Sequence, residues 1–471
     1  MGLIDELRGI LGEAHVLTGA ETARHARDWM GKYEGAPLAV ARPADTAGVA
    51  AAVRAAAAHG VPVVPVSGNT GLVGGTMTTG GLMISLERMN RIREIRRDAR
   101  LVLVEAGVVL QRIHEAVEPE GLYFPLWFGA RGSAMIGGVL STNAGGSNVL
   151  RYGSTRGLCL GLEVVLADGR VLNLMSELHK DNSGYDLKQL FIGAEGTLGI
   201  ITAAVMKLVP KPRAYATATV AARSLTEALP LLNRLQEATG GRVEGFEFMP
   251  AAYSRRLAEV RPDLGLAFDA IPEVTLLVEA ATTVPEEAAP RLDGSVPLVA
   301  TLERVLVGML DEGLIQDAVV AQNESQRLRM WARREAAAEI GVGLSPVVDT
   351  DVCLPLDRVE PFLQEAAARL TRLDPGHSTQ TVGHLGDGNL HFTIFPSRDD
   401  AGLKDAVMET VEDVVQELGG SFSAEHGIGL SKLSSMRRRK DPVALDVMRA
   451  VKSALDPAGL MNPGKVIPAA G

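Results

Sequence analysis

The 471-residue sequence contains little cysteine, no excess of basic charge and no long apolar run. Cys159 and Cys353 stand in apolar surroundings outside any Cys-x-x-Cys pair, so we expect reduced core thiols, as in cytoplasmic proteins. The net charge of −10 and the scattered basic residues argue against a nucleic-acid partner. No stretch of about 20 uncharged apolar residues predicts a transmembrane helix. The acidic, amphipathic N-terminal stretch lacks the features of a signal peptide.

Glycine, by contrast, is abundant: 51 of 471 residues, about 11% against a usual ~7%. Three glycine-rich segments cover Val66–Met77, Gly129–Ser154 and Gly193–Ile201. The first departs from the dinucleotide fingerprint in its spacing, and a strand rather than a helix is expected after it. By itself it is either a tight structural turn or a nest of amides that binds phosphate oxygens. Because the second is a long polar loop, and such loops are usually functional, the three together indicate an extended cofactor that carries phosphates.

The length predicts two or three domains. The first region should contain a helix at 46–59, strands at 81–87 and 101–107 separated by a basic turn, and a hairpin at 162–174 that turns at Asp168-Gly169. From Ala214 onward, strands and helices mix in a way typical of an α+β domain. We therefore expect domains at 1–213 and 214–425, followed by a helical segment at 426–471.

Two histidines lie seven residues apart in GHLGDGNLHF, with glycine, acid and asparagine between them. His384 and His391 are ligands suited to zinc, manganese or iron, and the glycines let the chain turn so that the rings converge. Glu425, in the segment EHG, offers a third ligand and would leave coordination positions open for substrate. The neighbouring His426 has the basicity needed to accept a hydroxyl proton near neutral pH. A structural, hydrogen-bonded histidine is the alternative for His426.

Six segments, taken together and in order, resemble those of the FAD-dependent D-2-hydroxyacid dehydrogenases, within the flavoprotein family typified by vanillyl-alcohol oxidase and p-cresol methylhydroxylase. They are SGNTGLVGG, GSAMIGGVLSTNAGG, RYGSTRGLCLGLEVVLADG, KDNSGYDLKQLFIGAEGTLGIIT, GHLGDGNLH and EHGIG. The resemblance implies an α+β fold: a two-subdomain FAD-binding domain of the p-cresol methylhydroxylase type, an α+β substrate (cap) domain that carries the metal site, and a C-terminal helical segment that returns to the FAD domain.

The resemblance also implies a set of residues around FAD. These are Ser67, Gly68, Asn69, Thr70, Gly71, Leu72, Gly75, Ser133, Gly138, Thr142, Asn143, Gly145, Gly146, Glu195, Thr197, Gly199 and Ile201. Some relatives attach the flavin covalently through a histidine or cysteine in the first loop. This loop contains neither residue, so we predict non-covalent FAD.

The implied reaction is oxidation of a D-2-hydroxyacid, of the D-2-hydroxyglutarate or D-lactate type, to the 2-oxoacid by hydride transfer to flavin N5. His384, His391 and Glu425 would bind a divalent metal, zinc before manganese or iron, and His426 would be the base. Arg334 and Asn389 match family positions near the substrate carboxylate, which an arginine can bind through two parallel hydrogen bonds. The neighbouring Arg333 is expected to be a surface charge. A quinone or an electron-transfer flavoprotein would accept the electrons, and a homodimer is a further expectation.

Two residues depart from the pattern of the 2-hydroxyglutarate enzymes. Ala338 stands where those enzymes have threonine, and Asp349 where they have lysine. Both family residues help to bind the distal carboxylate, which an aspartate would repel. A monocarboxylic substrate such as D-lactate is therefore at least as consistent with the sequence. The alternatives are a glycolate- or aldonate-type oxidase that uses oxygen and a non-redox metal-binding protein, although every proposed catalytic position carries a competent side chain.

Overall fold

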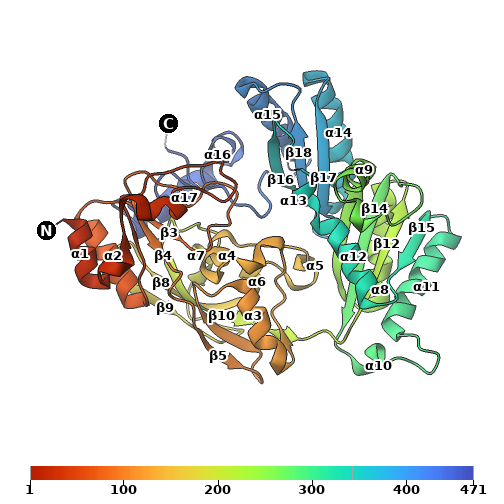
Figure 1. Cartoon of the computed structure of the whole chain (residues 1–471), viewed down its shortest axis with the longest axis horizontal. Coiled ribbons are helices and arrows are strands. Elements are labelled where there is room, and N and C mark those ends of the chain that lie inside the picture. Colours follow the sequence, from red (N-terminus) through yellow and green to blue (C-terminus); the bar gives the residue numbers. More distant parts are fainter. Residues whose placement is uncertain (1, 342, 470–471) are drawn as a thin grey trace. The chain divides into compact units, whose positions relative to one another are not determined.

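The computed structural model describes residues 2–341 and 343–469; Met1, Val342, Ala470 and Gly471, and with them the ends of the predicted first and last segments, lie outside it. The chain forms two compact units (Figure 1). The first unit comprises Met1–Gly145, Gly153–Pro210 and Glu425–Gly471, and the second comprises Gly146–Tyr152 and Lys211–Ala424. None of the described helices combines the length and the apolar character needed to cross a bilayer.

A small sheet in the first unit positions the first glycine loop. Its strands lie in the order β1 (Val16–Leu17), β2 (Ala39–Ala41), β4 (Leu82–Ser85) and β3 (Val63–Val66), and the last three are parallel. α1 (Leu3–Leu11) packs on α2 (Thr46–Ala58), whose alanine-rich face joins the buried core of this sheet. The glycine loop begins where β3 ends, at the carboxyl end of a parallel strand, a common location for ligand-binding loops.

The second sheet of this unit is antiparallel and has five strands. They are, in order, β5 (Ile92–Arg96), β6 (Leu101–Glu105), β10 (Ile200–Lys207), β8 (Cys159–Val165) and β9 (Val171–Leu174). β8 and β9 form the predicted hairpin, with Leu162 opposite Leu174 and Gly169 at a φ of 78° in the turn. The predicted basic turn is wrong, because Ile92–Arg96 forms the edge strand β5. Charged side chains are tolerated on an edge strand, where one side faces solvent.

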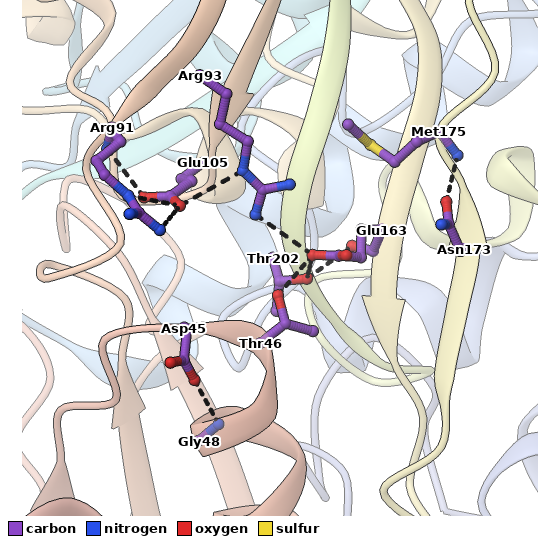
Figure 2. Close-up of polar contacts among 10 residues, drawn as sticks. All are labelled: Asp45, Thr46, Gly48, Arg91, Arg93, Glu105, Glu163, Asn173, Met175 and Thr202. Atoms are coloured by element: carbon purple, nitrogen blue, oxygen red, sulfur yellow. Dashed lines mark hydrogen bonds and ion pairs between the residues drawn. The ribbon is translucent and has the colours of Figure 1, made fainter.

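The arginines around β5 bind a buried and a half-buried carboxylate of the same sheet (Figure 2). Glu105 on β6 accepts hydrogen bonds from Nε and Nη2 of Arg91 at 3.1 and 2.8 Å. Burial raises the pKa of Glu105, but the hydrogen bonds and charge of Arg91 outweigh it, so the pKa lies below its ordinary value. Arg93 lies 3.6 Å from Glu163 on β8, which also accepts from Thr202 and from Thr46 at the start of α2. This network connects four strands and a helix of the first unit.

The long loop predicted at 129–154 is partly helical. It contains a 3₁₀ turn at Gly129–Gly132, α4 (Ile136–Thr142) and α5 (Val149–Tyr152), and α6 (Thr155–Leu158) follows it. α5 belongs to the second unit, where Arg151 and Tyr152 both donate to the buried carboxylate of Glu244, at 2.7 and 2.5 Å. α4 contains two glycines, Gly137 and Gly138, and glycine has low helix propensity, so the sequence pattern indicated a loop there.

The second unit contains a seven-stranded antiparallel sheet. The strand order is β15 (Asp317–Val320), β12 (Ala214–Ala222), β14 (Val274–Thr282), β13 (Val243–Pro250), β17 (Ser378–His384), β18 (Asn389–Phe395) and β16 (Val348–Cys353). One face packs against α8 (Ala228–Thr239), α11 (Pro297–Asp311), α14 (Val359–Leu373) and α15 (Ala401–Glu417), which bury the larger core. α9 (Ala251–Val260), α12 (Glu324–Glu335) and α13 (Ala337–Ile340) cover part of the other face through a smaller core that includes Val382 of β17.

Shorter elements complete the two units. They are α3 (Leu110–Val117), β7 (Leu122–Tyr123), α7 (Lys188–Phe191), β11 (Val209–Pro210) and α10 (Pro285–Ala288), with 3₁₀ turns at Glu13–His15, Gly19–His25, Glu118–Glu120, Leu225–Glu227, Pro262–Leu264 and Leu356–Arg358.

The C-terminal elements α16 (Leu433–Arg439) and α17 (Pro442–Leu455) belong to the first unit. After α17, the side-chain amide of Asn462 donates to the backbone oxygens of Gly75 and Glu195, at 3.0 and 2.7 Å. One residue near the end of the chain thus binds both the first and the third glycine loop.

Candidate functional site

The glycine segments of the first unit line one cavity of about 260 Å³. Twelve of the residues predicted around FAD lie on its wall: Ser67, Gly68, Asn69, Thr70, Gly71, Leu72, Gly75, Gly138, Thr142, Gly145, Glu195 and Ile201. Glu425 and His426 line the same cavity, although they follow the third glycine loop by more than 200 residues. The predicted base therefore lies on the wall of the predicted cofactor cavity.

The first loop has a conformation that its residue types explain. A Cβ added to Gly68 would lie 2.2 Å from the backbone oxygen of Ser133, so the two chain segments approach as closely as glycine allows. Asn69 has a φ of 51°, in the left-handed region that asparagine tolerates. Its side chain donates to the Arg27 oxygen at 3.1 Å and accepts from the Thr76 hydroxyl at 2.7 Å. These contacts hold the loop in shape independently of any ligand.

Glu195 joins the third glycine loop to the segment EHGIG. Its carboxylate accepts hydrogen bonds from the backbone N–H groups of Ile428 at 2.7 Å and Gly429 at 2.9 Å. Burial raises the pKa of Glu195 above its ordinary value despite these bonds. By binding Ile428 and Gly429, Glu195 holds the chain just after His426 against the cavity.

Five predicted FAD residues, all of them described, lie off the cavity wall. Ser133 contributes its backbone to the close approach at Gly68, and Asn143 uses its side-chain oxygen to accept from the Arg156 N–H at 2.9 Å. Thr197 donates its hydroxyl to the Ala194 oxygen, and Gly199 packs against Val164 and Phe191. Gly146 belongs to the second unit. In each case the neighbouring residue of the same motif faces the cavity instead.

Apart from Leu72 and Ile201, sequence analysis missed the apolar residues of the wall. The missed residues include Phe128, Met135, Val139 and Ile200. These side chains are common in ordinary cores, so no local pattern separated them from packing residues. Only their proximity in the sequence to the glycine segments could have suggested a role in binding the cofactor.

In the second unit, the segment that contains the two predicted metal ligands forms the hairpin of β17 and β18. His384 is the last residue of β17 and His391 the third residue of β18, and their ring centroids are 5.6 Å apart. Gly388 in the turn has a φ of 80°, and an added Cβ would lie 2.0 Å from the Leu354 oxygen. The glycines therefore make the tight turn that brings the two imidazoles together, as predicted.

A buried carboxylate lies behind His384. Glu247 on β13 is 1% exposed in its side chain and accepts from His384 Nδ1 at 2.9 Å and from Arg334 Nε at 2.7 Å. Burial raises the pKa of Glu247, but the charges and hydrogen bonds of His384 and Arg334 bring it below its ordinary value. A carboxylate that binds one imidazole nitrogen is the usual outer partner of a metal-binding histidine.

Asp351 on β16 has the corresponding position beside His391. The side chain of Asp351 is 1% exposed, and its Oδ1 lies 4.0 Å from His391 Nδ1. Asn389 donates its side-chain amide both to Asp351 Oδ1 at 2.9 Å and to the Val352 oxygen at 3.0 Å. These bonds use both N–H groups, so they favour a role for Asn389 in positioning Asp351 rather than in binding substrate.

The backbone N–H of Ala424 donates to Asp351 Oδ2 at 3.1 Å. Glu425 follows Ala424 directly in the chain and is the first residue of the C-terminal part of the first unit. Glu247 and Asp351 were missed in the sequence. Their signal was the presence of acidic residues inside strands that also carry large apolar residues, in VEGFEFM and VVDTDV.

Arg334 and Arg333 differ sharply in their surroundings. Arg334 is 7% exposed, and its Nη2 atom is buried and has no hydrogen-bond partner within residues 2–341 and 343–469. The expectation for Arg333 is wrong: its guanidinium donates to the backbone oxygens of Leu264, Gly265 and Leu266. Arg333 therefore holds a loop, while Arg334 retains hydrogen-bonding capacity inside the unit.

Both residues that depart from the family pattern are exposed. Ala338 lies on α13 and Asp349 on β16, where Asp349 accepts a hydrogen bond from the Thr393 hydroxyl at 3.1 Å.

Comparison with known proteins identifies the family of the chain. Residues 37–175 match the family description "FAD binding domain", and residues 211–466 match "FAD linked oxidases, C-terminal domain". The mitochondrial D-2-hydroxyglutarate dehydrogenase of Bos taurus is 39% identical over 94% of this chain and 79% of its own length. D-2-hydroxyglutarate dehydrogenase of Stutzerimonas stutzeri is 35% identical over 99% of each chain.

Two solved structures share the fold at low sequence identity. p-Cresol methylhydroxylase with substrate bound aligns with a TM-score of 0.75 and 16% identity, over 98% of this chain and 96% of the other. Alkyldihydroxyacetonephosphate synthase aligns with a TM-score of 0.72 and 18% identity, over 98% and 85%. The predicted fold class is confirmed, and the chain belongs to the family of FAD-linked oxidases that includes the D-2-hydroxyglutarate dehydrogenases.

Proposed function

We propose that this FAD-dependent D-2-hydroxyacid dehydrogenase oxidises its substrate with His426 as base, Arg334 as carboxylate ligand and a divalent metal bound near the hydroxyl. The relatives that it matches are named for D-2-hydroxyglutarate, and D-lactate is the second substrate type considered. The observation that carries the proposal is the presence of His426 on the wall of the glycine-loop cavity. A quinone or an electron-transfer flavoprotein as acceptor, a homodimer and a cytoplasmic location belong to the same proposal.

The residues of the cavity fit FAD. The glycine loops bring backbone close enough to bind phosphate oxygens, and a side chain at Gly138 would meet Ser67 at 3.3 Å. The apolar side chains of Phe128, Met135 and Val139 suit a planar aromatic ring. Bound FAD supplies the two-electron acceptor for the C2 hydrogen of the substrate.

His426 would take the proton of the 2-hydroxyl group, since an imidazole is the side chain best matched to this transfer near neutral pH. Arg334 would bind the C1 carboxylate. Its Nε is held by Glu247, so the guanidinium is fixed in orientation, and its buried Nη2 atom has hydrogen-bonding capacity that a carboxylate oxygen would satisfy. A guanidinium fixed in this way would hold the C1 carboxylate of the substrate in one orientation.

His384, His391 and Glu425 would hold the metal, and two imidazoles with one carboxylate suit zinc, manganese or iron. A divalent ion there would lower the pKa of the substrate hydroxyl. The support is the chemistry of the donors and the carboxylates Glu247 and Asp351 that lie beside the two histidines.

Anaerobic mixing of the purified holoenzyme with D- and L-2-hydroxyacids tests the function. We expect D-enantiomers to bleach the flavin absorbance and L-enantiomers to leave it unchanged. Bleaching by L-acids alone, or by none of the acids, would contradict the proposal, and protein without flavin absorbance would favour a non-redox role. Turnover with a dye acceptor faster than turnover with air would distinguish the dehydrogenase from an oxidase.

The flavin should be released when the protein is denatured, because the first loop, 67–76, contains no histidine or cysteine. Precipitation with acid, followed by centrifugation, should leave yellow colour in the supernatant. Colour retained in the pellet would show a covalent bond and refute non-covalent binding.

A further inference from the structure

Three polar side chains form a row on the sheet of the second unit, next to His391. In the antiparallel register, Gln380 of β17 and Asp349 of β16 both lie opposite Thr393 of β18. The next row along the strands consists of Val382, His391 and Asp351. Directly opposed residues of antiparallel strands share a face, and so do residues two apart, so both rows project from the same side of the sheet. The two rows are separated by about 7 Å, two residues along a strand.

The row on the other side of His391 is more buried. It contains Asn389, which is buried, and His384 and Cys353, which are half-buried; Cys353 donates its thiol to the Asp387 oxygen. The row of Gln380, Thr393 and Asp349 is open, since Asp349 is exposed and the other two are half-buried. A 2-hydroxyacid held through its hydroxyl at His391 therefore has room to extend its side chain over this open row.

The open row presents hydrogen-bond acceptors. Thr393 donates its only hydroxyl proton to Asp349, and Gln380 donates through Nε2 to the Ala337 oxygen at 3.2 Å. The Gln380 Oε1 atom is buried and has no partner among the described residues. Asp349 forms no ion pair with any residue in the described part of the chain, so its negative charge is not neutralised there.

We infer that Asp349, Thr393 and Gln380 form a specificity row that prefers a monocarboxylic D-2-hydroxyacid with a hydroxyl group on its side chain. A side-chain hydroxyl would donate to the Asp349 carboxylate, whereas a second carboxylate would be repelled by it. Arg334 binds the one carboxylate that such a substrate carries. The inference rests on the proposed function, because it assumes that the 2-hydroxyacid binds at His391 and Arg334.

Three acids that differ in the substituent on C4 test the row in the anaerobic holoenzyme: D-2,4-dihydroxybutanoate carries a hydroxyl there, D-2-hydroxybutanoate only hydrogen, and D-2-hydroxyglutarate a carboxylate. The measured quantity is the rate constant for flavin reduction divided by the apparent Kd. We expect it to be at least ~10-fold higher for the dihydroxy acid than for either of the others, because one charge-assisted hydrogen bond contributes a factor of this size. Equal values, or a preference for D-2-hydroxyglutarate, would overturn the inference while leaving the proposed function intact. If no D-acid reduces the flavin, the proposed function itself fails.

Asp349→Lys should reverse the charge of the row and shift the preference toward D-2-hydroxyglutarate by ~10-fold or more. Asp317→Lys is the matched control, since Asp317 is an exposed aspartate on the edge strand β15 of the same sheet. Binding of the product acids supplies a readout separate from turnover. Calorimetric titration of the oxidised enzyme should show that Asp349→Lys lowers the dissociation constant of 2-oxoglutarate and raises that of 2-oxo-4-hydroxybutanoate. An unchanged ratio of the two dissociation constants would refute the assignment.

Discussion

At the scale of single residues, Glu247 binds two side chains with different predicted functions: His384, the predicted metal ligand, and Arg334, the predicted ligand of the substrate carboxylate. One carboxylate oxygen accepts from His384 and the other from Arg334, so the orientation of the predicted metal ligand and that of the carboxylate ligand depend on one buried group. Removing either partner would leave a buried charge only partly compensated, which is costly. Glu247 is therefore expected to influence substrate and metal binding together.

Arg334→Ala should raise KM by roughly 10- to 100-fold, the effect of losing hydrogen bonds to a charged group. Arg334→Lys should recover little of this loss, because lysine cannot form two parallel bonds with a carboxylate. Steady-state kinetics with a dye acceptor provides the measurement, and Arg329→Ala, at an exposed position on the same helix α12, is the control. An unaltered KM in Arg334→Ala would mean that another residue binds the carboxylate.

His426→Ala should slow flavin reduction by ~10²–10⁴, the usual range for loss of a general base. Stopped-flow mixing of the anaerobic variant with substrate measures this step directly. The FAD content should remain that of the parent protein, and His179→Ala, on an exposed loop, should behave as the parent. Flavin reduction at the parent rate would assign His426 a structural role.

At the scale of elements, α3 contains a buried histidine, and we expect it to make the stability of the first unit sensitive to pH. His114 is 8% exposed, lies 5.3 Å from the Trp127 ring centroid and shares a hydrogen bond with the Leu126 oxygen at 3.0 Å. Burial lowers the pKa of His114 to about 4, against 6.5 for the ordinary side chain. Its second ring nitrogen is buried without a hydrogen-bond partner in the described structure, so a proton there would be unfavourable.

A group whose pKa is lowered by folding binds protons more strongly in the unfolded chain. The stabilisation from neutral His114 should be complete above about pH 6.5 and lost as the pH falls toward 4, reaching about 2 kcal/mol of lost stability near pH 5. Urea unfolding at pH 7.5 and pH 5 should show a smaller decline for His114→Gln than for the parent. His179→Gln, at an exposed site, should decline as the parent does; an equal decline in all three proteins would assign the pH effect to other groups.

At the scale of the whole molecule, the predicted FAD residues on the cavity wall lie in the first unit, and both predicted metal-binding histidines lie in the second. Mutation of the two histidines should therefore affect metal binding without removing FAD. The third predicted metal ligand, Glu425, and the predicted base, His426, belong to the first unit.

His391→Ala should reduce bound metal and activity together while FAD stays bound. Metal analysis and the flavin spectrum of the same purified sample measure both quantities, and His377→Ala, at a half-buried position in the same unit, is the control. Full turnover of the parent enzyme in the presence of a strong chelator would remove the metal from the proposal.

The sequence by itself determined the local structure and the location of the binding segments. The Asp168-Gly169 turn, the hairpin between His384 and His391 and the three glycine segments follow from conformational preferences within a few residues. The basic segment 91–97 was predicted as a turn but contains strand β5. The prediction was wrong because the arginines of this segment bind Glu105 and Glu163, which lie on other strands.

The tertiary structure alone decided which side chains meet. Glu247, Asp351 and the open row at Asp349 depend on strand register, and Gly146 was separated from Gly145 by the division into units. The physical reason is that a one-residue change in register moves a side chain to the opposite face of a sheet, and register is set by contacts between residues distant in sequence.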